Sequence, residues 1–384
     1  MTIITGDCLT EMAKMPDNSI DFIVTDPPYG LYFMGKDWDS SIPSMGYWQQ
    51  ALRICKPGSM LAAFGGSRTH HHLMLAIESA GWEIRDVIMW IYGSGFPKSN
   101  NFGKNRTNPE WHKFGTALKP AYEPIILAMK KLDGTFNQNA QRWGCSGINI
   151  DDSRIETTEN LTRDCLGLAS SVNEGYKRPY HEIAEKKVYG STKGRWPANI
   201  ILDEEAAEQL DQMSGVSKSP KAIVKGTKSS GGILNRCEGN RLSNSGHGDS
   251  GGASRFFYCP KASSRERNEG LEGIPIISCG TGALRDNGIG KLAQNTHPTV
   301  KPISLMKYII KLLAPPGNPT LLDPFAGSGS TLVAATELGI NSIGIELSEE
   351  YSEIARKRIE HAKNKDIQYD LFEKNEVNYD QTTN

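Results

Sequence analysis

Short apolar runs and amphipathic segments alternate along both ends of the chain. The apolar runs are rich in β-branched residues, as buried strands are, and the segments between them repeat apolar positions at the spacing of a helix. Such alternation predicts an α/β fold with a largely parallel sheet. The predicted strands are 1–7, 20–26, 59–64, 83–92, 122–130, 320–323 and 342–346, and the predicted helices are 9–15, 69–80, 303–313, 332–339 and 349–362.

The middle of the chain interrupts this alternation. Residues 131–254 hold only short strand-like pieces and end in a run rich in Gly and Ser, so we expect an inserted domain of mixed structure between two core halves, 1–130 and 255–364. The polar residues 365–384 are expected to form a mobile tail. Residues 93–120 also lose the pattern, and a long unpatterned loop directly after a core strand suggests a lid or clamp beside a site.

The charge of the chain is nearly balanced, with 43 Lys and Arg against 44 Asp and Glu and a net charge of −1. This balance gives no global case for binding nucleic acid, so any such case must be local. Two segments are basic, because 98–119 has a net charge of +4 and 218–267 has a net charge of +7. Basic side chains on a flexible backbone suit phosphate groups, although a solvated loop would have the same composition. The candidate contacts to nucleic acid are Lys98, Lys104, Arg106, Lys221, Lys225 and Lys228.

Several other classes of protein are disfavoured. No apolar run approaches the ~18 residues of a membrane span, and the N-terminus begins with a strand-like stretch, so no signal peptide is expected. The seven cysteines are scattered and form no C-x-x-C pair, which indicates reduced thiols in the cytoplasm and neither a disulfide framework nor a zinc site. Adjacent helical residues point in different directions, so His70, His71 and His72 indicate a solvated helix start, and no metal site is expected.

The stretch Ile20–Gly30 carries the first candidate chemistry. Its apolar strand ends at Asp26, and Pro27 and Pro28 forbid both further strand pairing and an immediate helix. Ligands bind at the carboxyl ends of strands in open α/β sheets. There the Asp26 carboxylate and the Pro27 carbonyl can accept the two hydrogens of a planar amino group, and Tyr29 can stack on the ring that carries it. The alternative is a plain strand and Pro-Pro turn, with Tyr29 as packing.

The second candidate site lies in residues 320–346, which predict a strand, a glycine turn, a helix and a strand that ends in an acid. Gly327 and Gly329 let a ligand approach the backbone where a Cβ would collide. Glu346 follows about twenty residues later, where an acid accepts hydrogen bonds from the hydroxyl pair of a ribose. The loop lacks the third glycine of a pyrophosphate site and follows Asp323, whose charge suits an ammonium or sulfonium. These features favour S-adenosylmethionine over a dinucleotide, and a tight turn in an ordinary βαβ unit is the alternative.

Together the two stretches resemble a known family. Asp26-Pro27-Pro28-Tyr29 and the run from Asp323 to Thr331, Asp-Pro-Phe-Ala-Gly-Ser-Gly-Ser-Thr, resemble the S-adenosylmethionine-dependent DNA amino-methyltransferases, the N4-cytosine/N6-adenine group. The motif with two prolines comes first and a long insert follows it, which is similar to the β-class order of that family. The resemblance covers most of residues 1–130 and 255–360. Further matching pieces are 51–58, 65–69, 90–100, 195–199 and 297–302.

The resemblance implies a Rossmann-like methyltransferase sheet that is circularly permuted. Residues 1–130 would form the catalytic half, 131–254 the target-recognition domain and 255–364 the cofactor-binding half. The strand that ends near Asp7 then belongs beside the strand that carries Glu346. Asp7 would reach the adenine of the cofactor, although a helix N-cap before Leu9 is the alternative. The implied ligands of S-adenosyl-L-methionine are Asp7, Thr299, Lys301, Asp323, Phe325, Ala326, Gly327, Ser328, Gly329, Ser330 and Glu346.

The resemblance also implies the reaction, with Asp26, Pro27, Pro28 and Tyr29 as the catalytic motif. By accepting the amine hydrogens, Asp26 and the Pro27 carbonyl would aim the nitrogen lone pair at the methyl group, which is transferred directly. A base inside a duplex is out of reach, so it must be flipped out. An aspartate in the first place of the motif is more typical of N6-adenine enzymes, and N4-cytosine methylation is the alternative.

The partners follow from the same resemblance. We expect double-stranded DNA as substrate, a cognate restriction endonuclease as a possible partner, and a monomer or homodimer in the cytoplasm of a bacterial or phage-infected cell. Amino methylation of RNA or of a protein glutamine is a further alternative. A catalytically silent DNA-binding module is another, against which the intact Asp26, Tyr29 and Gly327 argue.

Overall fold

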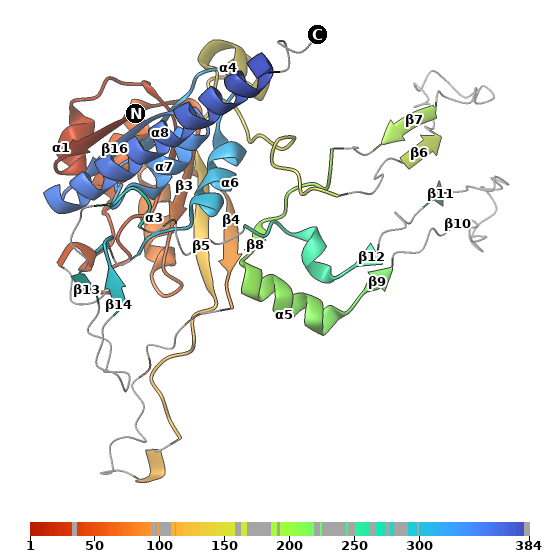
Figure 1. The fold of residues 1–384 in the computed structure, drawn as a ribbon, viewed down its shortest axis with the longest axis horizontal. Coiled ribbons are helices and arrows are strands. Elements are labelled where there is room, and N and C mark those ends of the chain that lie inside the picture. The colour runs from red at the N-terminus through yellow and green to blue at the C-terminus, as the bar shows by residue number, and fades with distance from the viewer. Residues whose placement is uncertain are drawn as a thin grey trace, which may run out of the picture. The chain divides into compact units, whose positions relative to one another are not determined.

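Strands from the two ends of the chain form the central sheet of the computed structural model (Figure 1). The structure describes residues 1–32, 37–93, 95, 99, 109–111, 113–157, 163–166, 186–189, 193–218, 223–224, 243–244, 250–260, 266, 268–272, 277–279, 291–297 and 299–379. Within these residues the sheet has eight strands in the order β1-β16-β15-β2-β3-β5-β4-β8. They are β1 (Thr2–Thr5), β2 (Ile20–Thr25), β3 (Cys55–Phe64), β4 (Glu83–Ile91), β5 (Tyr122–Met129), β8 (Ile200–Leu202), β15 (Thr320–Asp323) and β16 (Asn341–Glu346).

The pairing of the first and last strands confirms the permuted order. β1 runs parallel to β16, with Thr5 opposite Glu346, and β15 lies between β16 and β2. β2 and β3 are also parallel, whereas β5 runs antiparallel to both β3 and β4. The carboxyl ends of β1, β16, β15, β2 and β3 therefore meet at one edge of the sheet, and the amino end of β5 reaches the same edge.

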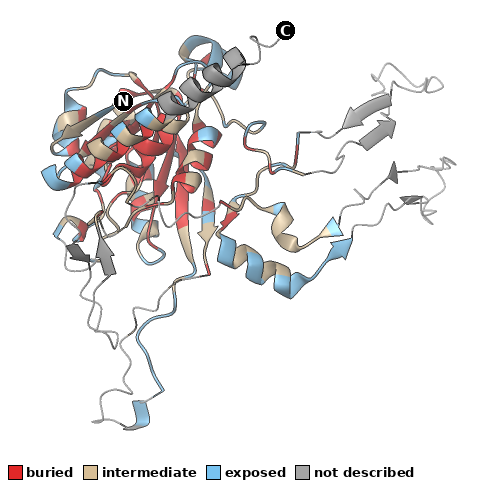
Figure 2. Cartoon of the chain, in the orientation of Figure 1, coloured by how far each residue is buried: buried red, intermediate tan, exposed pale blue. Residues whose placement is uncertain are grey.

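The helices pack on the sheet in two groups. α1, α2 and α3 contact one another in sequence, and so do α6, α7 and α8. Figure 2 shows the buried residues gathered in the strands and on the inner sides of these helices. Trp48, Leu73 and Ile77 lie fully buried under the first group. The helices are α1 (Cys8–Ala13), α2 (Met45–Ile54), α3 (His70–Ser79), α4 (Phe136–Trp143), α5 (Glu204–Ser214), α6 (Ile303–Leu313), α7 (Ser330–Glu337) and α8 (Glu349–Tyr379).

Shorter elements complete the described chain. Three 3₁₀ turns lie at η2 (Asp37–Asp39), η4 (Pro109–Trp111) and η5 (Ala253–Phe256). The remaining strands form antiparallel pairs, β6 with β7, β9 with β12, β10 with β11 and β13 with β14. Their bounds are β6 (Arg163–Leu166), β7 (Lys186–Tyr189), β9 (Ser217–Lys218), β10 (Ile223–Val224), β11 (Ser243–Asn244), β12 (Ser250–Gly251), β13 (Ile277–Cys279) and β14 (Lys291–Ala293).

β3 differs from its predicted bounds, because it begins at Cys55 and not at residue 59. Gly58 has φ +78, and a Cβ there would lie 2.7 Å from the Cys145 carbonyl oxygen. Cys145 comes directly after the C-cap of α4, a helix that was not predicted. Asn139 of α4 donates to the carbonyls of Pro57 (2.9 Å) and Cys145 (2.5 Å), so it ties the helix to the irregular start of β3.

α8 also differs from the prediction. It begins at Glu349 as expected but continues to Tyr379, beyond the predicted end at residue 362 and into the segment expected to be a mobile tail. The buried positions of its first part include Tyr351, Ile354 and Ala355. The two ends of this helix thus differ, since the first turns pack on the core and residues 366–379 are described only by their backbone.

The chain divides into two compact units. The first comprises Met1–Ser153, Asn199–Ala206 and Cys259–Asn384, and the second comprises Arg154–Ala198 and Ala207–Tyr258. Two stretches that the sequence assigns to the insert therefore lie in the first unit. The reason is that α4 packs on β3 and β8 pairs with β4.

No helix among the described residues has both the length and the apolar character needed to cross a membrane. They also contain no cluster of three His, Cys, Asp or Glu side chains placed to hold a metal ion. Among the described residues, Cys8, Cys55, Cys145 and Cys259 form no disulfide.

Candidate active site

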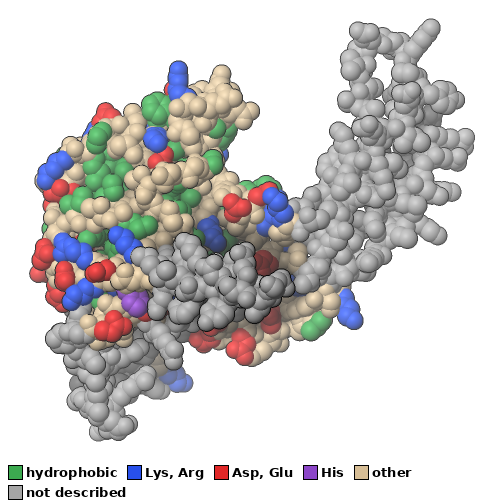
Figure 3. All heavy atoms as spheres, turned by 45° about the horizontal axis from the view of Figure 1, so that its top comes forward, with side chains coloured by type: hydrophobic (Ala, Val, Ile, Leu, Met, Phe, Trp, Pro, Cys, Tyr) green, Lys and Arg blue, Asp and Glu red, His purple; other side chains and the backbone are tan. Residues whose placement is uncertain are grey.

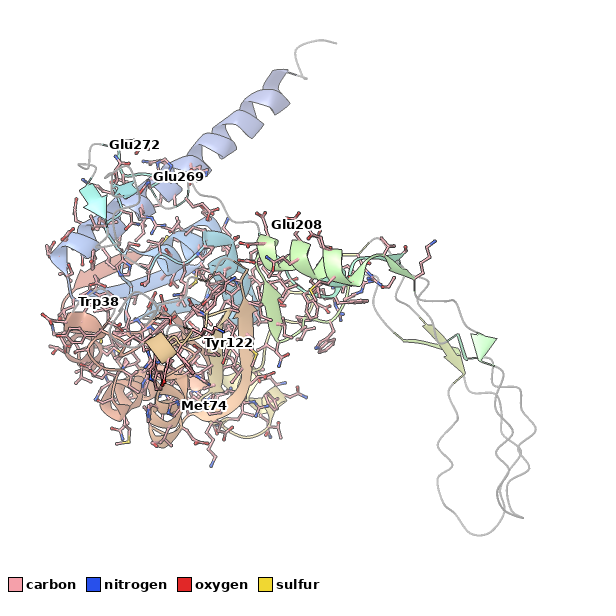
Figure 4. The ribbon with its side chains drawn as sticks, turned by 90° about the horizontal axis from the view of Figure 1, so that it is seen from below. Trp38, Met74, Tyr122, Glu208, Glu269 and Glu272 are labelled. Atoms are coloured by element: carbon pink, nitrogen blue, oxygen red, sulfur yellow. The ribbon has the colours of Figure 1, made fainter. Side chains whose placement is uncertain are left out.

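A cavity of about 1280 Å³ opens at the edge of the sheet where the parallel strands end. It lies within the first compact unit. Figure 4 labels two residues of its lining, Trp38 and Tyr122, among the side chains of that unit. The predicted site residues that line the cavity are Asp7, Asp26, Pro27, Pro28, Tyr29, Thr299, Lys301, Asp323, Phe325, Ala326, Gly327, Ser328, Ser330 and Glu346.

The Asp-Pro-Pro-Tyr turn leaves β2 and is held from two sides. The buried Asp39 carboxylate accepts hydrogen bonds from the backbone N–H groups of Tyr29 (2.6 Å), Gly30 (3.0 Å) and Leu31 (3.2 Å). The Thr69 hydroxyl donates to the Tyr29 carbonyl at 2.7 Å. The turn is therefore fixed by side chains far from it in sequence, and not by the two prolines alone.

The Tyr29 hydroxyl lies at the centre of a polar cluster. It is 2.8 Å from Asp26 Oδ1 and 3.0 Å from Glu123 Oε2. Lys301 Nζ lies 2.5 Å from Asp26 Oδ2, 3.2 Å from the Tyr29 hydroxyl and 3.4 Å from Glu123 Oε2. One lysine thus serves two carboxylates, and its side chain is only 8% exposed.

The charges of this cluster shift one another's pKa values. Burial raises the pKa of Asp26, Lys301 beside it acts in the opposite direction, and Glu123 adds to the rise. Burial and the two neighbouring carboxylates raise the pKa of Tyr29 well above its usual value, so its hydroxyl stays protonated. Burial alone would lower the pKa of Lys301, but Asp26 and Glu123 raise it, so the amine stays charged.

The glycine loop runs from β15 into α7 and passes close to its neighbours. Gly327 has φ +53, and a Cβ there would lie 2.9 Å from His297 Nε2. Gly329 does not line the cavity and instead caps α7 against Ala355. The buried Arg358 donates to the Ser328 carbonyl at 2.6 Å and lies 3.3 Å from Ser330 Oγ, so it supports the loop from behind.

Two buried carboxylates flank this loop. Asp323 Oδ1 accepts from the Thr25 hydroxyl at 2.7 Å and from the Phe325 N–H at 3.1 Å. Burial raises the pKa of Asp323 to about 6. Glu346 accepts from the N–H groups of Gly327 and Ser348, both at 2.8 Å, and burial raises its pKa as well. Each Glu346 oxygen keeps a lone pair that a ligand hydroxyl could use.

The rest of the predicted cofactor side is apolar or already paired. The Phe325 ring packs beside those of Tyr47 (centroids 6.1 Å apart) and Trp48 (6.3 Å), and Phe325 and Tyr47 both line the cavity. Asp7 caps α1 by accepting from the Thr10 N–H and hydroxyl, both at 2.9 Å, which is the structural role weighed as its alternative. It also lines the cavity, so its role as a cap is compatible with the predicted contact to the cofactor.

The cavity wall beyond the glycine loop contains His297 and Thr299. The Thr299 N–H lies 3.4 Å from His297 Nδ1. The His297 ring stacks on Trp38 at 5.9 Å and meets Tyr351 edge-on at 4.7 Å. This aromatic group packs beside the glycine loop, where His297 lies close to Gly327. Six predicted contacts to nucleic acid lie outside the described residues, namely Lys98, Lys104, Arg106, Lys221, Lys225 and Lys228.

Three side chains of the site were not predicted. Asp39 anchors the Pro-Pro turn, Glu123 shares Lys301 with Asp26, and Arg358 holds the glycine loop. Glu123 stands at the start of a strong apolar strand followed by proline, a position that could have drawn attention to it. Asp39 and Arg358 carry no comparable local signal.

The comparisons with known proteins fit this geometry. The sequence profile of the DNA methylase family, which comprises N6 and N4 methyltransferases, matches residues 20–357. YubD of Escherichia coli (strain K12), a protein named as a methylase, is 48% identical over 63 residues, which are 16% of this chain and 27% of that protein. The Type II methyltransferase M2.DpnII of Streptococcus pneumoniae is 50% identical over 64 residues, 17% of this chain and 24% of that protein. The match thus spans about a quarter of each relative.

Two solved structures align with most of the chain at low similarity. The PvuII DNA methyltransferase (cytosine-N4-specific) aligns with a TM-score of 0.46 and 14% identity, over 93% of this chain and 85% of that one. The complex of M1.HpyAVI with SAM aligns with a TM-score of 0.39 and 17% identity, over 93% of this chain and 98% of that one.

Proposed function

The chain belongs to the DNA methylase family, and we propose that it transfers a methyl group from S-adenosyl-L-methionine to the exocyclic amine of a base in DNA, with adenine N6 as the favoured target. One observation carries the proposal. The Asp26–Tyr29 turn and the acidic glycine loop line one cavity of about 1280 Å³. Single-ligand pockets are about 300–1,000 Å³. The larger cavity suits a cofactor and a flat base side by side.

The residues at the glycine loop fit S-adenosyl-L-methionine. Glu346 would accept from the ribose hydroxyls, and the Phe325 and Tyr47 rings offer apolar faces for adenine. Asp7, at the end of β1, is placed for the adenine amine. Gly327 leaves open the space in which a Cβ would meet His297. The cofactor supplies a sulfonium-bound methyl group, and Asp323 contributes negative charge near that cation.

The residues at the Pro-Pro turn fit an amine acceptor site. Asp26 Oδ1 and the Pro27 carbonyl would take the two hydrogens of the amine, which turns its lone pair away from the ring and toward the methyl. Tyr29 would stack on the base. A Cβ at Gly66 would lie 3.2 Å from Tyr29 Cδ2, so Gly66 packs closely on this ring and helps to fix its plane.

The choice of base rests on the first residue of the turn. Adenine N6 and cytosine N4 both present a planar –NH2, so Asp26 and Pro27 would serve either. The aspartate itself, which is more typical of adenine enzymes, supports adenine. Methylated cytosine as the product would reassign the base without changing the reaction.

DNA is the proposed partner of the basic segments 98–119 and 218–267. The face drawn in Figure 3 mixes acidic and basic side chains over the described part of the chain. The phosphate contacts are assigned to the two segments because of their net charges of +4 and +7. The likeness to a protein named as a type II methyltransferase supports a cognate restriction endonuclease as a partner. A monomer or homodimer would suffice, because the cavity is lined by one chain.

Methyl transfer to unmodified DNA tests the proposal. Labelled S-adenosylmethionine and double-stranded DNA should give N6-methyl-2′-deoxyadenosine on nucleoside analysis, whereas RNA should stay unlabelled. Asp26→Asn should lower the transfer rate by about 10²-fold or more while cofactor affinity stays within threefold. Glu346→Gln should instead lower the cofactor affinity and leave the transfer rate at saturating cofactor nearly unchanged, because its new amide would face an N–H of the loop. Equal loss of cofactor affinity in both variants would refute this division of roles.

A further inference from the structure

Two carboxylates lie within hydrogen-bonding distance of the Tyr29 hydroxyl, which has one hydrogen to donate. They belong to Asp26, at 2.8 Å, and to Glu123, at 3.0 Å. Lys301 approaches both carboxylates as well, at 2.5 Å and 3.4 Å. When the hydroxyl points to Asp26, each oxygen of that carboxylate already accepts one hydrogen bond, so an incoming amine has to share Asp26 Oδ1 with Tyr29.

From this geometry we propose that Glu123 is the second acceptor of the active site. It accepts the hydrogen bond of the Tyr29 hydroxyl when the amine arrives, and after methylation it receives, through Tyr29, the one proton that the amine releases. The proposal rests on the proposed function and adds a residue to it. With the hydroxyl turned to Glu123, Asp26 Oδ1 is open to the amine. Lys301 keeps both carboxylates in place throughout.

The proton balance of the reaction requires such an acceptor. The amine nitrogen forms a bond to the methyl carbon as the carbon–sulfur bond breaks, and the sulfonium becomes a neutral thioether. The nitrogen then carries a positive charge, and one of its protons passes to Asp26 Oδ1. Asp26 gives that proton to the Tyr29 oxygen while the Tyr29 hydrogen passes to Glu123 Oε2. Asp26 is again a carboxylate, and Glu123, which is 23% exposed, can release the proton to water.

The position of Glu123 follows from the direction of β5. Because β5 runs antiparallel to β3 and β4, its first residues reach the edge at which the other strands end. Glu123 is opposite Trp90 of β4 and is followed by Pro124, whose carbonyl accepts from the Gly65 N–H at 2.9 Å. The carboxylate is therefore attached to a rigid strand and is well placed for a fixed relay.

The other charged groups around Glu123 do not replace it. Lys119 also lines the cavity, but it donates to the Gly93 carbonyl. Burial raises the pKa of Tyr92 to about 12, with Glu123 adding to the rise, so Tyr92 stays neutral. The titratable or charged groups of the cavity on this side are Asp26, Tyr29, Arg68, Tyr92, Lys119 and Lys301.

Glu123→Gln separates this role from a structural one. Glutamine keeps the size and one acceptor but can take no proton, so the single-turnover rate should fall about 10- to 100-fold. The negative charge of Glu123 raises the pKa of Asp26, so its loss should move the acid limb of the pH–rate profile to lower pH. The KM for DNA and the cofactor affinity should stay within threefold. Glu123→Asp, which restores the carboxylate, should recover part of the rate.

A second variant tests the relay itself. Tyr29→Phe removes the shared hydroxyl, and the double variant Tyr29→Phe/Glu123→Gln should be no slower than the slower single variant, because both act in one path. Glu83→Gln, at the exposed start of β4, is the matched control for loss of a carboxylate. A Glu123→Gln rate within threefold of wild type with an unmoved acid limb, or additive losses in the double variant, would overturn the proposal. The wild type is assayed first, so failure of DNA methylation itself would appear separately.

Discussion

The Asp39 carboxylate gives a sharp test of how the catalytic turn is held. It is 2% exposed and accepts three backbone N–H groups of the turn, from Tyr29, Gly30 and Leu31. A hydrogen bond to a charged group contributes roughly 1.5–3 kcal/mol, but the released N–H groups of this half-buried turn can reach water. Asp39→Ala should therefore lower the free energy of unfolding by about 2–4 kcal/mol. The urea midpoint of the first unfolding transition measures it.

The same change should also slow the reaction, because the turn carries Asp26 and the Pro27 carbonyl. We expect a single-turnover rate at least tenfold lower, with cofactor affinity by calorimetry within threefold. Asp39→Asn should give an intermediate stability, since its amide would face an N–H of the turn. Asp37→Asn is the control, because within the described residues the Asp37 carboxylate accepts from the exposed Tyr32 hydroxyl, at 2.9 Å, and not from the catalytic turn. An Asp39→Ala variant with wild-type stability and rate would refute the anchoring role.

Three further variants test other parts of the site. Gly327→Ala should weaken cofactor binding at least tenfold in calorimetry, whereas Gly317→Ala, with φ +96 and open space around it, should not. Asp323→Asn removes a buried carboxyl group whose pKa of about 6 lies above that of the unfolded chain. Ionisation of Asp323 as the pH rises destabilises the folded wild type and not the variant, so in urea titrations the stability of the variant relative to wild type should rise by about 2–3 kcal/mol between pH 4 and 7 and then level off. A difference independent of pH would count against this reasoning. Glutamine at three lysines should reduce the salt slope of DNA binding by roughly 0.9 per lost phosphate contact and leave the methylated sequence unchanged, and an unchanged slope would remove these lysines from the interface. The three are Lys221, Lys225 and Lys228.

The core strands could be predicted because parallel strands are buried on both faces and appear as continuous apolar runs. β2 and β15 begin and end within a residue or so of their predicted limits, and the edge at which they end places both motifs together. Two errors have different causes. The predicted strand starts too late, at residue 59, because Pro57 and Gly58 were expected to lie outside it. Gly58 instead forms an irregular part of β3. α4 was missed although Thr135 and Gln138 form a capping box, a signal present in the sequence.

The unpredicted site residues could not be found by local pattern. Glu123 precedes a proline at the start of an apolar strand, but a sequence does not state the direction of that strand in the sheet, so the pattern alone does not bring Glu123 to the site. Asp39 acts on backbone groups about ten residues away, and such a bond depends on the path of the loop. Arg358 occupies a helix in which the other described basic side chains are half-buried or exposed, and only the packing of α8 shows that Arg358 is buried.

The charges along the cavity connect its two halves. Five carboxylates of its lining belong to the proposed cofactor, catalytic and relay positions, whereas Lys301 is the one basic side chain buried among them. Such an excess of negative charge attracts a sulfonium and repels phosphate. The DNA backbone would therefore stay outside, and only an uncharged base would enter, which agrees with base flipping. Transfer of the methyl group removes the positive charge from sulfur, so the attraction that favours binding of the cofactor is weaker for the product, and this difference favours its release. The five carboxylates are those of Asp7, Asp26, Glu123, Asp323 and Glu346.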